Sequence, residues 1–284
     1  MSITLVYTFS GTGNSLHVTQ ELQKRLSGSE LVPIVHLLGQ DTIMTEAEVV
    51  GLVFPSFCTT IPIPVHAFLR KVEFRSAHYL FAICTRGGSP SDAFDHINVL
   101  LKGQGKRLDA QMNITMPWNH PLGKEDLPRT ATHERIQQLE SKMEEKLDAF
   151  AEIVLARDPY VRPDTAATIE LPWWGEAMTS LIPRSLNYEL HRFMYQDLIH
   201  FYADGACNGC GICEEVCLSC RVELVDEEPV WKEEIKCYGC FACINYCPRQ
   251  AIQIQSRFPV KSYTNVTGRY HHPSVSYKDI AAQR

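Results

Sequence analysis

The chain lacks an excess of basic residues and has no long hydrophobic run. Its 27 Lys and Arg are outnumbered by 33 Asp and Glu, which gives a net charge of −6 at pH 7. Because phosphate binding needs a basic surface, we expect no nucleic-acid partner. No stretch reaches the roughly 18 to 20 apolar residues of a membrane span, so we expect no transmembrane segment.

Cysteine is scarce over most of the chain. Of 11 cysteines, only Cys58 and Cys84 precede residue 200, and the others lie between Cys207 and Cys247. Clustered cysteines form disulfides in secreted proteins and bind metal in reducing compartments. Residues 1–15 lack the basic start and the apolar stretch of a signal peptide. We therefore expect a cytoplasmic protein whose clustered cysteines bind metal.

Residues 1–157 alternate between strand-like and helix-like segments. The strand-like runs are too uniformly apolar for a half-exposed sheet, which favours a parallel sheet buried on both faces. The alternation predicts an α/β doubly wound fold. We expect strands at Ile3–Tyr7, Leu31–Val35, Val49–Phe54, Tyr79–Cys84 and within Arg107–Met116, and helices near 14–27, 63–72, 90–102 and Thr132–Leu155.

The remaining chain falls into three segments. Prolines interrupt residues 158–203, which we interpret as a connector with a helix over Ser185–Phe201. A cysteine-rich domain at 204–255 and a tail at 256–284 follow. The Trp173–Trp174 pair of the connector fits packing onto the first domain, which we favour, or a membrane-edge or partner contact.

The cysteine-rich segment and the tail carry opposite charges. Residues 204–255 have nine Asp and Glu against four Lys and Arg, whereas residues 256–284 have five Lys and Arg against one Asp. Two interpretations stay open: the tail folds back onto the acidic domain, or it is an unrelated solvated segment.

Eight of the cysteines form two runs of identical spacing: Cys207-x2-Cys210-x2-Cys213-x3-Cys217 and Cys237-x2-Cys240-x2-Cys243-x3-Cys247-Pro248. This is the bacterial spacing for [4Fe–4S] clusters, in which the fourth cysteine ligates the cluster of the other run. Zinc sites usually pair Cys-x2-Cys with a wider gap. We predict two clusters, the first held by Cys207, Cys210, Cys213 and Cys247, and the second by Cys237, Cys240, Cys243 and Cys217.

The first run departs from the pattern in one respect. Leu218 stands where proline usually follows the fourth cysteine, and Cys220 lies three residues after Cys217. Cys220 is therefore an alternative fourth ligand. We assign Cys217 because its spacing fits.

A loop of glycines and small polar residues follows the first expected strand and leads directly into a helix. Its residues are Ser10, Gly11, Thr12, Gly13, Asn14 and Ser15. Such groups at a helix N-terminus form an anion cradle. The loop lacks the lysine of nucleoside-triphosphate loops and the third glycine of dinucleotide loops. It fits a monophosphate held by neutral donors, and an ordinary strand–helix turn is the alternative.

Three later segments are expected at the same edge, because each follows a strand, and ligands of open α/β sheets bind outside the carboxyl ends of strands. The candidate residues there are Pro55, Ser56, Phe57 and Thr59; Thr85, Arg86, Gly87 and Gly88; and Trp118 and Asn119.

Ser10–Ser15 resembles the FMN phosphate loop of flavodoxins, and nearly the whole chain resembles flavodoxin–ferredoxin fusion proteins of anaerobes. Residues 1–157 match the flavodoxin part and 204–255 the ferredoxin part, while the connector and Arg269–Pro273 also look like that family. The resemblance implies a sheet of order 2-1-3-4-5, a C-terminal α+β ferredoxin-like domain, and FMN. Its phosphate would lie on Ser10–Ser15.

The same resemblance implies that the loops at 55–60 and 85–89 flank the isoalloxazine ring. No clear aromatic pair encloses the ring, since Phe57 and Trp118 are only candidates. One ring face would then be open to a substrate or a cluster. Arg86 fits either a place beside the flavin or a solvated surface. Cys58 fits either a place facing the flavin or a buried structural position.

The combined features indicate an electron-transfer iron–sulfur flavoprotein. Clusters carry single electrons, and FMN takes one or two. Three hypotheses remain: an oxidoreductase that reduces a small-molecule acceptor at the flavin, a carrier for a partner redox protein, and a redox sensor without flavin. The sequence identifies no catalytic side chain, direction of electron flow or oligomeric state.

Overall fold

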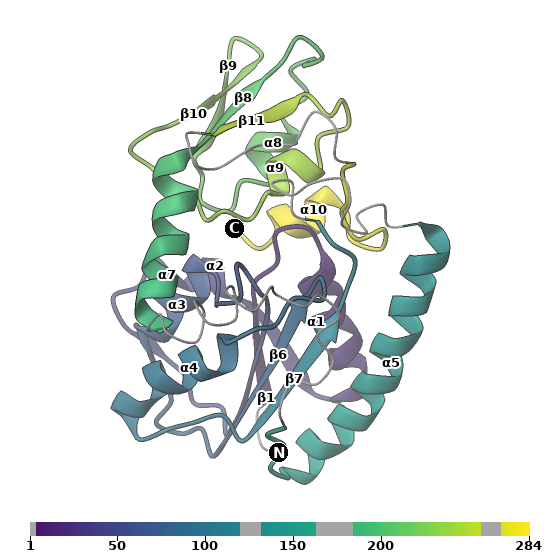
Figure 1. The fold of residues 1–284 in the computed structure, drawn as a ribbon. Coiled ribbons are helices and arrows are strands. Elements are labelled where there is room, and N and C mark those ends of the chain that lie inside the picture. Colours follow the sequence, from purple (N-terminus) through teal and green to yellow (C-terminus); the bar gives the residue numbers. More distant parts are fainter. Residues whose placement is uncertain (1–3, 120–131, 163–183, 257–267) are drawn as a thin grey trace, which may run out of the picture.

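The computed structural model describes residues 4–119, 132–162, 184–256 and 268–284. A sheet with flanking helices occupies one half, and the cysteine-rich segment forms the other half, with helix α10 (Tyr277–Ala281) between them (Figure 1). The Trp173–Trp174 pair lies outside the described residues. None of the described helices is long and apolar enough to cross a membrane.

Five parallel strands form the main sheet. They are β1 (Thr4–Thr8), β2 (Ser29–Pro33), β4 (Val49–Pro55), β6 (Tyr79–Arg86) and β7 (Ala110–Thr115). Their order is β2-β1-β4-β6-β7, which is 2-1-3-4-5 when only the strands of this sheet are numbered. The expected order is confirmed, and it fits a flavodoxin-like fold. Two short strands, β3 (Ile43–Met44) and β5 (Val72–Glu73), pair separately.

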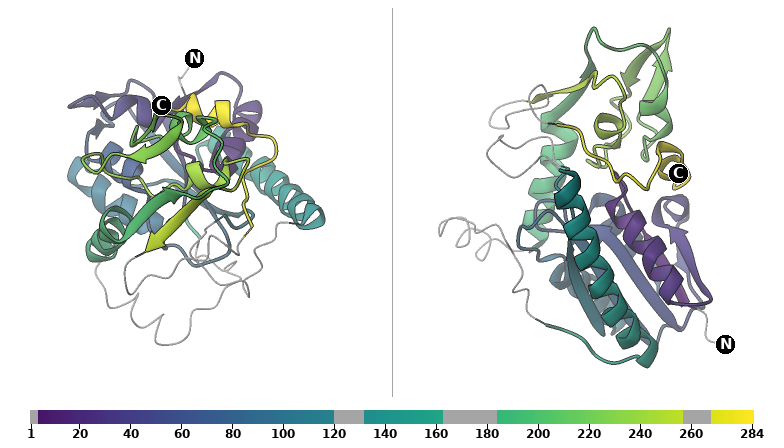
Figure 2. Two further views of the ribbon diagram at one scale, coloured as in Figure 1. Left: turned by 90° about the horizontal axis from the view of Figure 1, so that it is seen from above. Right: turned by 90° about the vertical axis from the view of Figure 1, so that its right-hand side faces the viewer.

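Helices cover both faces of this sheet. Helices α1 (Asn14–Arg25) and α5 (His133–Ala156) lie together on one face (Figure 2, right). The short helices α2 (Ile34–Leu37), α3 (Ile63–Leu69) and α4 (Ala93–Leu101, continued by a 3₁₀ turn at Lys102–Gln104) pack on the other. All eight residues of β6 are buried, as expected for a parallel sheet covered on both sides.

The second strand is displaced from its predicted position. The apolar run Leu31–Val35 predicts a strand to residue 35, but β2 ends at Pro33 and α2 begins at Ile34. Proline has no backbone N–H to extend a ladder and its fixed φ suits the residue before a helix, so the chain turns there.

Gly51 in the middle of β4 marks a tight contact inside the sheet unit. A Cβ atom built at this position would lie 2.6 Å from Cε2 of Phe81, a fully buried side chain on β6. We expect Gly51→Ala to lower the free energy of unfolding by about 1–3 kcal/mol, because a packed core accommodates an added methyl group poorly. The urea midpoint measures this effect. Gly103→Ala is the control, since nothing lies within 4 Å of its Cβ position. Equal midpoints for the two variants would contradict the prediction.

The cysteine-rich half has its own small core. Helix α7 (Arg184–Phe193) runs into a π-helical turn (Met194–Leu198) and then into strand β8 (Ile199–Ala203). Strand β8 pairs antiparallel with β11 (Ile252–Ser256), and β9 (Val222–Val225) pairs with β10 (Glu228–Trp231). Helices α8 (Ile212–Glu215) and α9 (Ala242–Asn245) begin inside the two cysteine runs. Residues Tyr195, Ile199, Phe241, Ile244 and Ile252 form the centre of this core.

The helix predicted over Ser185–Phe201 is therefore too long. Its last residues belong to β8, where backbone pairing with β11 replaces the helical hydrogen bonds. The alternation of Ile199 and Phe201 with polar neighbours also suits a strand.

The described part of the tail folds back onto both halves. The Arg269 guanidinium donates to the Ile252 carbonyl oxygen at 2.9 Å, and the Tyr270 N–H donates to Asn245 Oδ1 at 3.0 Å. The first of the two interpretations of the tail is thus correct for residues 268–284.

Candidate cofactor cleft and cysteine clusters

The glycine-containing loop after β1 forms the start of helix α1. Gly13 is the N-cap residue; it adopts a left-handed conformation with φ 98° and has no side chain to cap the helix. Asn14 and Ser15, the first two helical residues, are buried. The N–H groups of a first helical turn have no intrahelical acceptor and attract anions. The loop thus has the geometry of an anion cradle.

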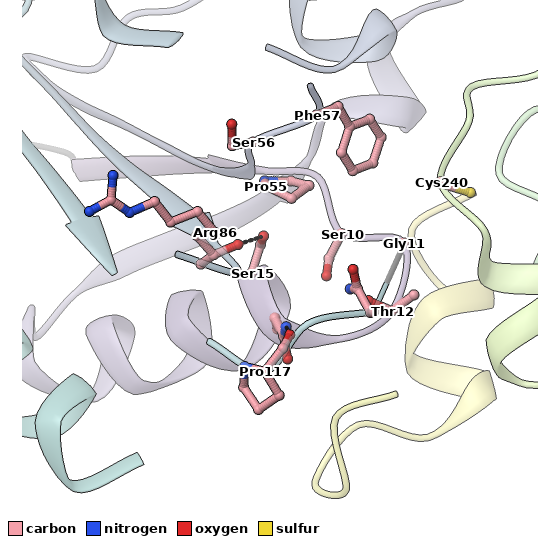
Figure 3. A pocket seen from close by; sticks show the side chains of 14 residues that line it. Ser10, Gly11, Thr12, Ser15, Pro55, Ser56, Phe57, Arg86, Pro117 and Cys240 are labelled. Atoms are coloured by element: carbon pink, nitrogen blue, oxygen red, sulfur yellow. Dashed lines mark hydrogen bonds between the residues drawn. The ribbon is translucent and has the colours of Figure 1, made fainter. Parts of the chain in front are cut away.

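A cleft opens beside this loop at the carboxyl ends of the strands, as predicted. Figure 3 shows the side chains that line it. The lining residues are Ser10, Gly11, Thr12, Asn14, Ser15, Pro55, Ser56, Phe57, Thr85, Arg86, Gly87, Pro117, Asn119 and Cys240. The structure therefore brings together most of the sequence candidates from four separate loops.

Four candidates do not line this cleft. Gly13 belongs to the loop but packs against His272 and Val275. Thr59 has a left-handed backbone, and its carbonyl oxygen accepts from the Asp92 N–H at 2.7 Å. Gly88 is absent from the lining, and Trp118 packs against Gly87 instead. Pro117 and Cys240 also line the cleft, and the sequence did not predict either of them there. Proline offers no polar side chain, and Cys240 belongs to the cysteine-rich segment.

Hydrogen bonds hold the polar groups of the loop in place. Ser10 Oγ accepts from the Gly13 N–H at 3.1 Å, and Ser15 Oγ lies 2.7 Å from Thr85 Oγ1. The Asn119 amide donates to Thr12 Oγ1. The hydroxyl groups are thus oriented by the protein before any ligand binds.

Arg86 is a buried residue that lines the cleft. Its side chain is 4% exposed, and one guanidinium nitrogen donates to the Ser89 carbonyl oxygen at 3.1 Å. Burial lowers the pKa of Arg86, and the nearby Cys84 opposes that shift. The guanidinium extends away from the phosphate loop (Figure 3). The interpretation as a solvated surface arginine is wrong.

Cys58 and Phe57 lie on the loop after β4. Phe57 lines the cleft and makes an edge contact with Phe9, whose ring centroid is 6.3 Å away. The Cys58 thiol lies 3.7 Å from the Tyr195 hydroxyl, and burial raises its pKa. The thiol therefore faces the connector helix and does not line the cleft.

One group of thiols gathers around Cys213. Burial first, and then the charges of Cys210, Cys247 and Cys207, raise the pKa of Cys213 to about 12. These are the four cysteines predicted for the first cluster, and Cys247 comes from the second run. Cys247 is thus near enough to the first run for its charge to act on Cys213.

A second group contains Cys237, Cys240, Cys243 and Cys217. Burial and then Cys217 raise the pKa of the Cys237 thiol to about 11, although a hydrogen bond from Gly239 opposes the shift. Burial and the charges of the same neighbours also raise the pKa values of Cys240 and Cys243. Buried thiols ionise at high cost unless a cation compensates, so this donor set fits a metal cluster.

Backbone N–H groups point at several of these sulfurs. Arg221, Gly239 and Ala251 donate to the Sγ atoms of Cys217, Cys237 and Cys247, each at 3.3 Å. Such donors stabilise negative charge on ligating sulfur and tune a cluster's potential. Cys220, in contrast, is exposed and has a left-handed φ of 56°.

The cleft and the second cysteine group are in direct contact. A Cβ atom at Gly11 would lie 2.7 Å from Cys240 Cβ and still closer to the Cys240 carbonyl oxygen. Only glycine allows this approach. Cys240 is therefore both a wall of the cleft and a member of the second thiol group (Figure 3).

No protein-family model matches the chain, and no curated protein matches it. Among solved structures, an NAD(P)H:quinone oxidoreductase from Methanothermobacter marburgensis is 9% identical with a TM-score of 0.35, over 53% of this chain and 96% of that one. A Megasphaera elsdenii flavodoxin is 15% identical with a TM-score of 0.32, over 53% and 98%. An NADH:FMN oxidoreductase is 14% identical with a TM-score of 0.33, over 59% and 95%. Because all these TM-scores are low, the fold assignment rests on the observed strand order.

Proposed function

We propose that this protein is an electron-transfer iron–sulfur flavoprotein of the flavodoxin–ferredoxin fusion type. Residues 1–157 form the FMN-binding domain, and residues 204–255 form a ferredoxin-like domain with two [4Fe–4S] clusters. The observation that carries the proposal is the position of Cys240, which lines the cleft and belongs to the second thiol group. When bound, FMN exchanges one or two electrons and each cluster exchanges one.

The cleft supports the flavin part of the proposal. Ser10, Thr12, Asn14 and Ser15 would hold the phosphate, together with the N–H groups of the first turn of α1. Their side chains are buried, and the N-cap residue Gly13 has no side chain that could cap the helix in place of a ligand. The loops at Pro55–Phe57 and Thr85–Gly87 would contact the ring. No cationic side chain is needed at the phosphate, because neutral donors and the helix N-terminus stabilise a dianion.

The two thiol groups support the cluster part. Each contains three cysteines of one run and the fourth of the other, as the spacing predicts. Cys210 in the first group is exposed, which suits electron exchange with a partner molecule. The second group adjoins the cleft through Gly11 and Cys240. The first cluster would therefore face the outside, and the second would face the flavin.

Composition provides the first test of the proposal. We expect the chain purified without oxygen to contain about one FMN and roughly eight iron and eight sulfide ions, because eight cysteines provide the ligands of two [4Fe–4S] clusters. Flavin fluorescence after release, together with iron and sulfide assays, measures this. Roughly four irons would contradict the two-cluster assignment. Iron and sulfide without any flavin would instead favour the redox-sensor hypothesis.

The identity of the electron acceptor needs a second test. We propose a small-molecule acceptor at the flavin, and the alternative is a partner redox enzyme. Rapid reoxidation of the reduced holoprotein by a small quinone, with no added protein, supports the first. No turnover with small acceptors, combined with rapid reduction of a redox protein, supports the alternative.

A further inference from the structure

We propose that residues 268–284, here called the clasp, position the phosphate loop for binding a phosphate group. The inference rests on the proposed function only for the identity of the ligand, FMN. The clasp approaches the loop from more than 250 residues away in sequence and contacts it at successive positions. Its helix α10 lies between the two halves of the molecule, next to the start of α1 (Figure 1).

Gln283 fixes the start of the loop. Its side chain is 2% exposed, its Oε1 accepts from the Ser10 N–H at 3.0 Å, and its Nε2 donates to the Ser10 carbonyl oxygen at 2.9 Å. This paired bond resembles one rung of a β-ladder made by a side chain. It satisfies both backbone groups of Ser10 and thereby sets the orientation of the adjoining peptide groups.

The middle of the loop is held by two further clasp residues. The His272 N–H donates to the Thr12 carbonyl oxygen at 2.8 Å, and the Tyr270 hydroxyl donates to Asn14 Oδ1 at 3.2 Å. Val275 packs on the Cα of Gly13, where a Cβ atom would approach to 2.9 Å. The clasp therefore fills the side of the loop that faces away from the cleft.

These contacts matter for an anion because of the sign of the groups involved. A carbonyl oxygen that faces a phosphate repels it, whereas an N–H attracts it. The clasp supplies donors to the carbonyl oxygens of Ser10 and Thr12. With these carbonyls held on the clasp side, the first-turn N–H groups of α1 are left for a ligand in the cleft.

A cluster of His17, Glu140 and His272 attaches the clasp to the rest of the sheet unit. The two histidine Nε2 atoms lie 2.9 and 2.7 Å from the two carboxylate oxygens of Glu140 on α5, and the histidine rings stack at 4.0 Å. Burial opposes ionisation of Glu140, but these hydrogen bonds outweigh it and hold its pKa at about 2. The carboxylate thus stays charged and links α1, α5 and the clasp.

The same three side chains have ligand atoms within 4.8 Å of one another, which is compatible with a metal site. The hydrogen bond from the Ser274 N–H to His272 Nδ1, at 3.2 Å, argues against it. Because Nδ1 accepts, the proton is on Nε2, which then has no lone pair for a metal. We therefore assign these residues as a hydrogen-bonded lock for the clasp.

The test compares the affinities of the full chain for FMN and for riboflavin, which lacks the phosphate. The protein keeps its clusters and is freed of flavin by dialysis against concentrated bromide at neutral pH. Quenching of flavin fluorescence gives each Kd. We expect Gln283→Ala to raise the Kd for FMN about 10-fold and to leave the Kd for riboflavin within about 2-fold. Gln138→Ala, at an exposed site on α5, is the matched control and should change neither.

Glu140→Gln provides a second variant of nearly unchanged size, and cluster absorbance checks that both variants fold. We expect the same selective loss of FMN affinity in Glu140→Gln. We expect no zinc bound to the wild-type protein or to Glu140→Gln. Unchanged FMN affinity, or an equal loss for both flavins, would overturn the inference. One zinc ion per chain that is lost in Glu140→Gln would overturn the assignment of the lock.

Failure of the proposed function would be visible in the wild-type protein. If that protein binds neither flavin, FMN is not its ligand. Calorimetry with inorganic phosphate, on the wild-type protein and Gln283→Ala, then tests the role of the clasp. About a 10-fold weaker binding to Gln283→Ala would support the clasp, and equal or undetectable binding by both proteins would overturn it.

Discussion

Replacing Cys217 with serine is expected to remove about half of the iron, roughly four of eight atoms per chain, while Cys220→Ser retains all of it. Burial first, and then the charges of neighbours that include Cys217, raise the pKa values of Cys237, Cys240 and Cys243, so Cys217 lies near those three thiols. Its sulfur also accepts the Arg221 N–H at 3.3 Å. Serine is a poor ligand for iron in place of a thiolate, so the cluster with only three cysteines is expected to be lost.

Cys220 is the matched control because it lies three residues away in the same loop. It is exposed and has a left-handed backbone, and no backbone N–H among the described residues donates to its sulfur as Arg221 does to Cys217. Iron and sulfide assays and the visible absorbance of anaerobically purified protein measure the outcome. Loss of a cluster in Cys220→Ser, with both clusters kept in Cys217→Ser, would show that the ligand assignment is wrong.

Sequence patterns predicted the alternating strands and helices of the sheet unit, whereas the strand order followed from the family resemblance and the second strand was misplaced. A parallel strand buried on both faces must be apolar throughout, and the runs at 49–54 and 79–84 have no other use in a protein of this composition. Local chemistry also predicted that the loop at Ser10–Ser15 begins a helix and lies at the strand-end cleft, because glycines and hydroxyls at a helix start favour an anion. Cysteine spacing predicts how the thiols would group, because in the bacterial pattern each run supplies three ligands at fixed separations.

Other features depend on contacts that no local pattern encodes. The paired bond between Gln283 and Ser10 joins residues at opposite ends of the chain, and a single glutamine in a polar tail carries no signal. The switch from helix to strand at Ile199 is caused by pairing with β11, which the preceding residues do not show. Cys240 was predicted as a ligand, but its place in the cleft wall arises only when the two halves pack together.

The contact between Gly11 and Cys240 leads to the second large expected effect. Gly11→Ala should raise the Kd for FMN roughly 5- to 150-fold, which corresponds to about 1–3 kcal/mol of overpacking. A Cβ atom there would lie 2.7 Å from Cys240 Cβ and would also meet the Cys240 backbone, which cannot rotate away as a flexible side chain would. Either the phosphate loop or the cysteine loop must move, and both movements alter the shared wall of the cleft.

The same substitution should also slow the reduction of bound flavin by electrons that enter through the clusters. Stopped-flow absorbance, with FMN at saturating concentration and a one-electron protein donor, separates this effect from weaker binding. Gly39→Ala is the control, because nothing lies within 4 Å of its Cβ position. If Gly11→Ala binds FMN with wild-type affinity and its flavin is reduced at the wild-type rate, the contact with Cys240 is not part of the electron path. A slower rate at full occupancy would instead identify the junction between the phosphate loop and the second cysteine group as the point where the two halves exchange electrons.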